Sequence, residues 1–216
     1  MKDYELFQAA LGLGNEWFVV KSDFNQDEKR LDIYLDFERG SQFECPVCHE
    51  RCGAYDTKEL VWQHLNFFQY KTYLHAWVPR ISCKDHGVKQ IQVPWARERS
   101  GFTLLFEAMI MALVDQMPVK AIADMVGIED TRLWRIIEYY VNKALEQSDL
   151  SQVRRVGVDE TSSRKGHKYV TLFVDLDTNK VIFVTKGKDS LTLQAFKEHL
   201  IKYGGSPDAI TDFSCD

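Results

Sequence analysis

Four metal-binding side chains occur in two closely spaced pairs, and they constrain the fold of this chain more than any other feature. Cys45 and Cys48 are separated by two residues, and Cys83 and His86 repeat that spacing further along the chain. Zinc prefers a tetrahedron of thiolate and imidazole ligands, and a two-residue gap lets a tight turn direct both side chains at one ion. Because strand-like apolar runs flank each pair, the sequence predicts a β-rich zinc ribbon over residues 41–96, with structural Zn²⁺.

Some alternatives to this ligand set remain open. Four further side chains could replace one of the ligands: His49, Cys52, His64 and His75. The two later histidines lie in aromatic-rich, strand-like sequence, where a packed and hydrogen-bonded histidine is more common than a ligand. The first cysteine pair could also be ordinary buried thiols. Disulfide bonds are not expected, because the five cysteines are an odd number and the chain has no secretion signal.

Composition and charge narrow the class of protein. The chain has 216 residues, of which 45% are hydrophobic, as in globular proteins. No apolar run approaches the ~20 residues that span a bilayer, and no signal peptide is evident, so we expect a cytoplasmic protein without a membrane partner. The net charge of −5 counts mildly against nucleic-acid binding. Only the segments 45–96 and 151–216 are basic, by +2 and +1, so any DNA contact must come from local patches.

The segment before the ribbon predicts a helix and a β-hairpin within residues 1–40. The apolar runs at 17–20 and 31–37 flank a polar turn at 25–27. The second run alternates apolar and acidic residues, which is the period of a strand with two different faces. Its acids are most simply a solvated face, and we assign them no function.

Residues 97–150 have the apolar spacing of helices and predict a helix-turn-helix segment. Ser100 can cap a first helix, and a short helix over 118–126 precedes Gly127. A second helix then begins at Asp130 or Thr131, and the small Ala121 and Ala123 would allow close packing of the pair. The alternative is a plain helical hairpin inside a bundle.

In the DNA-binding form of this motif, the start of the second helix meets base edges in the major groove. The candidates for that contact are Thr131, Arg132 and Arg135. Trp134 and Ile137 are better explained as core residues than as readers of bases.

The last third of the chain predicts part of an α/β domain. Strand-like runs at 154–160, 169–175 and 180–184 are followed by a helix over 191–201, capped by Asp189 or Ser190. A fourth strand-like run then reaches residue 216. An acid at the end of the first strand and another on the fourth is the layout of an RNase H-like nuclease that works with two metal ions.

Carboxylates on neighbouring strand ends can hold the pair of Mg²⁺ ions that phosphoryl transfer uses, and Asp159 supplies one of them. On the fourth strand Asp212, Ser214 and Asp216 share one strand face, so alternation cannot choose the second ligand. Glu160 faces the opposite way from Asp159. Two more acids, Asp175 and Asp177, are better explained as turn-forming residues.

Three features in this order resemble bacterial insertion-sequence transposases of the ISL-three family. They are the two metal-binding pairs, the helix-turn-helix near 118–138, and a string that runs from Gly-Val-Asp-Glu at 157–160 through Arg-Lys-Gly-His at 164–167 to Val-Asp-Leu-Asp at 174–177. The resemblance covers roughly residues 40–216. It implies an α+β multidomain protein with a zinc ribbon (41–96), a helix-turn-helix segment (97–150) and the first part of an RNase H-like catalytic domain (151–216).

The resemblance also implies function. The ribbon and the helix-turn-helix would bind double-stranded DNA at the element's terminal inverted repeats, and the catalytic domain would cut and rejoin DNA with magnesium. A homodimer on DNA is a further expectation. It assigns Asp159 and Asp216 as catalytic carboxylates. Asp212 would then lie near the second carboxylate without being a catalytic residue. The family's catalytic glutamate lies further downstream, so we expect this chain alone to be inactive. His86 stands where the family commonly has cysteine. The alternative is a non-catalytic zinc-ribbon and helix-turn-helix DNA-binding protein, a transposase remnant.

Overall fold

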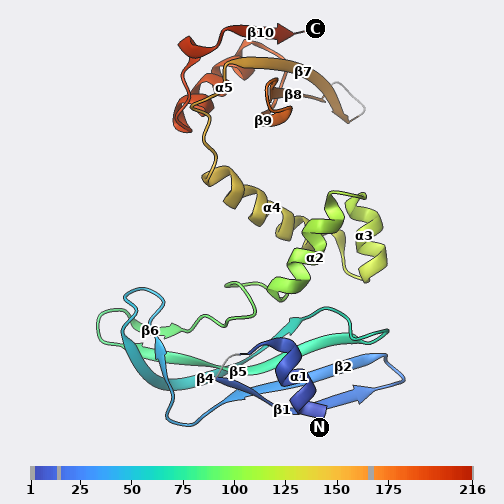
Figure 1. Cartoon of the computed structure of the whole chain (residues 1–216), viewed down its shortest axis with the longest axis vertical. Helices are drawn as coiled ribbons and strands as arrows, with labels where there is room; N and C mark the ends of the chain where they lie inside the picture. Colours follow the sequence, from blue (N-terminus) through green and yellow to red (C-terminus); the bar gives the residue numbers. More distant parts are fainter. Residues whose placement is uncertain (1–2, 14–15, 165–167, 216) are drawn as a thin grey trace. The chain divides into compact units, whose positions relative to one another are not determined.

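The chain forms two compact units, Met1–Ile137 and Glu138–Asp216, in a computed structural model that describes residues 3–13, 16–164 and 168–215 (Figure 1). The elements of the first unit are α1 (Asp3–Leu11), β1 (Trp17–Asn25), β2 (Arg30–Phe37), β3 (Gln42–Glu44), β4 (Arg51–Gln63), β5 (Lys71–Cys83), β6 (Gly87–Gln90), α2 (Leu104–Val114), α3 (Val119–Val126) and the start of α4 (Asp130–Glu146). This mixture of β-rich and helical parts agrees with the predicted α+β class.

One six-stranded sheet organises the first unit. Its strand order is β1-β2-β5-β4-β3, with β6 paired to β5. The β2–β5 pair is parallel and the other pairs are antiparallel. The predicted hairpin is present as β1 and β2, and β2 joins the ribbon strand β5. The sheet therefore runs across the boundary that the sequence suggested at residues 40 and 41.

Alternating side chains place the core on one face of this sheet. Leu31, Ile33 and Leu35 of β2 are buried, together with Leu74 and other residues of β5. Helix α1 lies over the sheet (Figure 1), and Phe7 joins the same core.

The expectation of a solvated acidic face on β2 is wrong for Asp32. Its carboxylate accepts hydrogen bonds from Arg30 at 2.6 and 2.7 Å and from Nε2 of His75 at 2.5 Å. The side chain is only 13% exposed. His75 on the neighbouring strand β5 therefore covers this acid. The alternation of apolar and acidic residues along β2 could not reveal this partner.

The helical part corrects the predicted helix start. Helix α2 is capped by Thr103, whose Oγ1 accepts from the backbone N–H of Phe106, not by Ser100. The hydroxyl of Ser100 instead donates to the buried carboxylate of Glu107, which also accepts from Arg97. Gly127 ends α3 with a φ of 65°, so the predicted turn between the two later helices is present.

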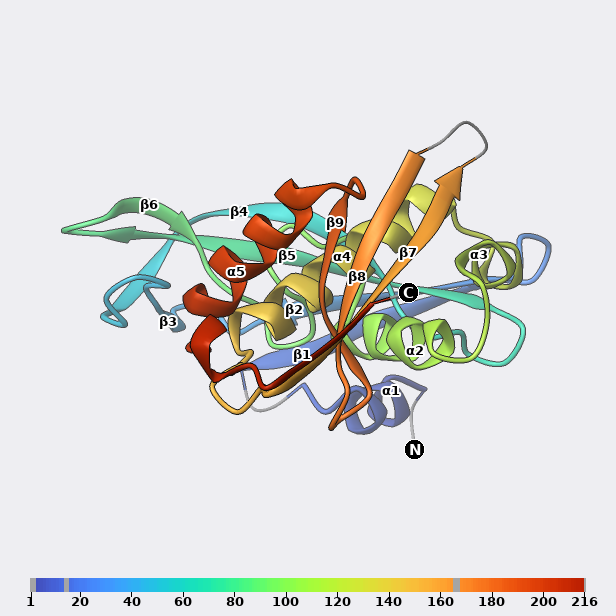
Figure 2. The ribbon, with the colours of Figure 1, turned by 90° about the horizontal axis from the view of Figure 1, so that it is seen from above.

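The second unit holds β7 (Arg155–Arg164), β8 (Lys168–Asp175), β9 (Lys180–Lys186), α5 (Ser190–Lys202), the short helix η1 (Pro207–Ala209) and β10 (Asp212–Cys215). The sheet order is β10-β7-β8-β9, and β10 is parallel to β7. Asp189 caps α5 through a bond from the N–H of Leu191. Helix α5 lies beside the sheet (Figure 2), where Phe196 stacks on Phe173 with ring centroids 4.2 Å apart.

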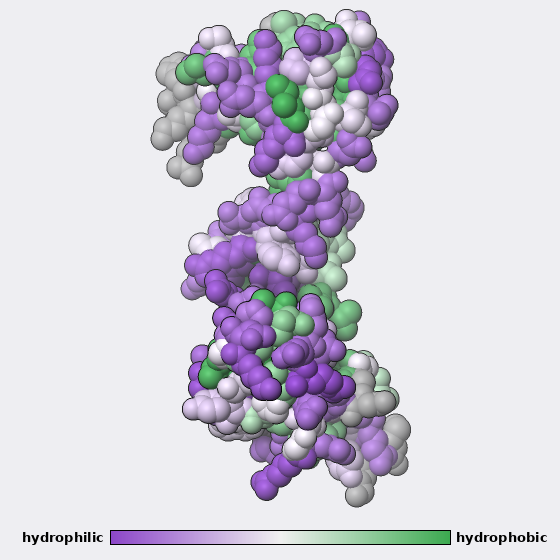
Figure 3. Space-filling view, turned by 90° about the vertical axis from the view of Figure 1, so that its left-hand side faces the viewer, coloured by the Kyte–Doolittle hydropathy of each residue, from purple (hydrophilic) through white to green (hydrophobic). Residues whose placement is uncertain are grey.

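The face of the protein drawn in Figure 3 is mostly polar. Hydrophilic side chains cover most of the face drawn in Figure 3, with apolar ones in small patches among them. Within the described ranges, no helix is both long enough and apolar enough to cross a membrane.

Candidate functional site

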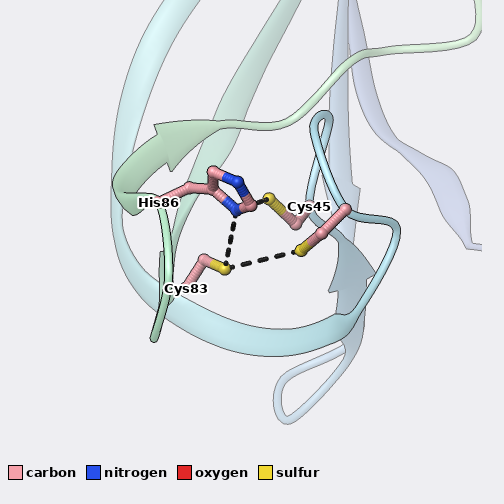
Figure 4. Close-up of side chains that lie close together, drawn as sticks. Cys45, Cys83 and His86 are labelled. Carbon is pink, nitrogen blue, oxygen red and sulfur yellow. Dashed lines mark hydrogen bonds between the residues drawn. The ribbon is translucent and has the colours of Figure 1, made fainter.

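Two hairpin turns bring the predicted metal ligands to one point. Cys45 and Cys48 lie in the turn between β3 and β4, where the N–H of Cys45 donates to the carbonyl of Glu50. Cys83 ends β5, and His86 lies in the following turn before β6. The labelled side chains in Figure 4 converge although they come from separate turns.

The distances in this cluster fit one tetrahedral zinc ion. The four donor atoms all lie within 4.8 Å of one another. Sγ of Cys48 lies 3.6 Å from Sγ of Cys83, and Nδ1 of His86 lies 3.5 Å from Cys83 and 3.9 Å from Cys45. Zinc bonded to sulfur at ~2.3 Å and nitrogen at ~2.05 Å would separate two sulfurs by about 3.8 Å and sulfur from nitrogen by about 3.6 Å. These three distances lie within about 0.3 Å of the separations around such an ion, so the donor set suits zinc.

The local electrostatics already favour thiolate at two of the three cysteines. Backbone N–H groups of Cys48 and Val47 lower the pKa of Cys45, and the side chain of His86 lowers the pKa of Cys83. The backbone N–H of Glu50 acts to lower the pKa of Cys48, but burial and the two neighbouring thiols outweigh it and raise that pKa to about 11. A divalent cation would stabilise the thiolate form of all three.

The alternative ligands lie outside this cluster. Nδ1 of the exposed His49 is 3.7 Å from Glu44, and the thiol of Cys52 points to the carbonyl of Glu50. His64 contacts the hydroxyl of Thr103 at 2.9 Å, while His75 bonds Asp32. His64 and His75 are thus packed and hydrogen-bonded, as the sequence predicted.

The candidate DNA-reading residues lie on the first turns of α4. Thr131, Arg132 and Arg135 are exposed, whereas Leu133 and Ile136 on the opposite side are buried. The guanidinium of Arg132 lies over the ring of Phe102, 4.4 Å from its centroid. Arg132 is thus held against the loop that precedes α2.

Two expectations about packing in this segment are wrong in part. Ile137 is buried as expected, but Trp134 is 55% exposed, because the buried stripe of α4 runs through Leu133, Ile136 and Ile137. Ala123 is buried, whereas Ala121 is exposed. Trp134 and Arg135 are therefore both accessible on α4, and the apolar pattern of the helix did not indicate this for Trp134.

The structure places only part of the predicted catalytic pair. Asp159 lies exposed on β7, paired with Leu172 of β8. The described part of β10 ends at Cys215, opposite Val158, and Asp216 lies outside the described residues.

Asp212 lies away from Asp159 along the strands, and Asp175 lies at the β8–β9 turn. Asp212 pairs with Arg155, four residues before Asp159, so the two acidic positions are about 13 Å apart along the strands. The carboxylate of Asp175 accepts from the N–H of Asp177 and the hydroxyl of Thr178, which confirms that it stabilises the turn.

Three family models match separate stretches of the chain in order. The model described as zinc-finger of transposase IS204/IS1001/IS1096/IS1165 matches residues 41–86, and the helix-turn-helix domain of transposase family ISL3 matches residues 91–141. The ISL3 model described as "Transposase" matches residues 156–216. The chain belongs to the ISL3 family of transposases.

Curated relatives of this family agree with the match. The transposase for insertion sequence element IS1557 of Mycobacterium tuberculosis is 26% identical over 211 residues, which cover 93% of this chain and 47% of the relative. The transposase for IS1001 of Bordetella parapertussis is 24% identical, over 93% of this chain and 50% of the relative. The chain thus spans about half the length of these relatives. No solved structure matches it.

Proposed function

We propose that this chain acts in DNA transposition: the ribbon and the helix-turn-helix bind the terminal inverted repeats of an insertion sequence, and the second unit takes part in metal-dependent strand cleavage and transfer. The observation that carries this proposal is the succession of three ISL3 modules in one chain, the first of which contains the clustered Cys45, Cys48, Cys83 and His86.

The ribbon has a structural role in this proposal. A zinc ion held by the four clustered side chains would tie the β3–β4 turn to the β5–β6 turn. Metal binding of this kind supplies much of the folding free energy of small metal domains. The ion therefore fixes the shape of a DNA-binding surface and takes no part in the reaction.

In the second unit we propose an RNase H-like domain with Asp159 and Asp216 as Mg²⁺ ligands. The three antiparallel strands followed by a helix and a parallel strand next to β7 support this assignment. Magnesium would activate the attacking oxygen and stabilise the leaving oxygen. The register counts against Asp212, because a carboxylate about 13 Å away along the strands cannot share ions that lie about 4 Å apart.

The test of this proposal is an assay of DNA strand cleavage at the element's ends, carried out with the unaltered natural protein. Asp159→Asn and Asp216→Asn should each abolish Mg²⁺-dependent cleavage while end binding stays unchanged. Asp212→Asn is the matched control on the same strand pair, and it should have a milder effect. Full activity of Asp159→Asn would refute the catalytic assignment. End binding without any cleavage by the unaltered protein would favour a non-catalytic DNA-binding role.

A further inference from the structure

A groove of about 790 Å³ lies between the zinc ribbon and the helix-turn-helix segment of the first unit. One wall carries Val47, which lies between the ligands Cys45 and Cys48, together with residues of β4 and β6. The other wall is the loop that leads into α2 and includes Gly101. Both predicted DNA-binding modules therefore contribute to one concave surface.

The groove is basic although the chain as a whole is acidic. Its lining carries Lys58, Lys89, Arg97 and Arg99 but a single acid, Glu98. Arg97 is paired with the buried Glu107, and Nε of Arg99 lies 3.4 Å from Glu98. The two lysines form no ion pair within the part of the chain that the structure describes, and both are exposed. Their charges are available to an anionic ligand.

The loop wall is built so that it presents an arginine. Arg99 has a φ of 59°, in the left-handed region that side chains other than glycine adopt rarely, and its side chain is 91% exposed. A bond from the N–H of Ser100 to the carbonyl of Arg97 closes this turn, and Ser100 is itself anchored to the buried Glu107. The loop thus keeps Arg99 in an unfavourable backbone conformation that exposes its side chain to solvent.

The same loop connects the groove to the candidate reading helix. A Cβ added at Gly101 would lie 3.3 Å from Nη2 of Arg132, so this guanidinium borders the groove. It also stacks on Phe102, the next residue of the loop. The cations therefore extend from the ribbon strands β4 and β6 to the start of α4.

We propose that this groove binds the phosphate backbone of a DNA duplex, with Lys58, Lys89, Arg99 and Arg132 as phosphate contacts, while Arg135 on α4 is left to read bases. The proposal rests on the end-binding function above and deepens it. Phosphate contacts position a protein on DNA without reading sequence, and each releases counterions. Since Val47 belongs to the metal-binding turn, loss of zinc would also deform one wall.

The test is the salt dependence of binding to two fluorescent duplexes, one with the element's terminal repeat and one with the same bases shuffled. The triple variant Lys58→Gln, Lys89→Gln, Arg99→Gly should lower the slope of log K against log salt by about 2 to 3, because each phosphate contact contributes about 0.9. Both duplexes should weaken by the same factor. Arg135→Ala should instead reduce the preference for the repeat.

Matched variants separate a lost contact from a lost fold. Arg99→Gly relieves the left-handed backbone, so zinc content should stay unchanged, and Arg99→Lys should keep the wild-type slope. Lys21→Gln with Arg39→Gln removes two exposed charges of the first unit outside the groove and should leave the slope unchanged.

The outcomes distinguish this proposal from the function on which it rests. A zinc-loaded triple variant with the wild-type slope, or one that loses only its preference for the repeat, would overturn the groove proposal. If the unaltered chain shows no preference for the repeat but the triple variant still lowers the slope on both duplexes, end recognition fails and the groove stands. Absence of any binding by the unaltered chain overturns both.

Discussion

At the residue scale, the cluster of Cys45, Cys48, Cys83 and His86 has the spacing of metal ligands and not of a disulfide. The sulfurs of Cys48 and Cys83 are 3.6 Å apart, whereas a disulfide bond is about 2.05 Å long. We predict about one zinc ion per purified chain, and Cys48→Ser should lose the ion and destabilise the ribbon. Cys52→Ser, a cysteine in the same region but outside the cluster, should keep it. Elemental analysis with thermal unfolding checks this, and a normally folded, zinc-free wild type would contradict it.

Asp32 yields a second prediction at this scale. Burial acts to raise its pKa, but hydrogen bonds from Arg30 and His75 outweigh it and hold the pKa below the ordinary value of 3.8. Asp32→Ala should therefore lower the free energy of unfolding at pH 7 by about 2 kcal/mol. Because the folded-state pKa is depressed, this stabilisation is complete above about pH 4 and is lost as the pH falls further. Urea unfolding of the wild type and of Asp32→Ala at pH 7 and pH 3 measures this loss of stability. An equal loss at both pH values would show that the charged carboxylate is not its source.

The metal ligands could be predicted because their signal is local spacing. The partners of Asp32 could not, since His75 lies on a strand that is adjacent to β2 in the sheet but distant in sequence. The groove cations were missed for the same reason: Lys58, Lys89 and Arg99 lie on separate elements. The net charge of +2 over residues 45–96 was the one available indication.

At the element scale, the turn between α3 and α4 depends on Gly127. Its φ of 65° suits glycine, and a Cβ would lie 2.7 Å from Nζ of Lys71. We predict that Gly127→Ala lowers the free energy of unfolding by about 1–2 kcal/mol, the ordinary cost of placing a side chain in the left-handed region. Gly53→Ala in β4 is the control, since φ is not positive there and a Cβ meets nothing within 4 Å. Equal stability of the two variants would contradict this account of the turn.

Helix and strand periods gave the elements but not every helix end. The sequence analysis predicted Ser100 as the cap, whereas the cap is Thr103, which also has a hydroxyl side chain. The structure selects Thr103 because the buried Glu107 engages the hydroxyl of Ser100. The exposure of Trp134 has a similar origin, since the position of the buried stripe on α4 is set by tertiary packing.

At the scale of the whole molecule, the order of modules was evident from sequence, because each module has its own motif. The sequence did not reveal that the N-terminal hairpin and the ribbon form one sheet. The hairpin β1–β2 shares a sheet and a core with the ribbon strands, through the parallel pairing of β2 with β5. Pairing between strands so far apart in sequence leaves no local pattern.

The central claim is that the ribbon and the helix-turn-helix together recognise the ends of an insertion sequence. Its most direct test is equilibrium binding of the zinc-loaded chain to the terminal repeat and to a shuffled duplex at about 0.15 M salt. We predict at least about a thousandfold preference for the repeat, as specific DNA-binding proteins show, and a loss of that preference when zinc is removed by a chelator. Equal affinity of the zinc-loaded chain for both duplexes would contradict the account.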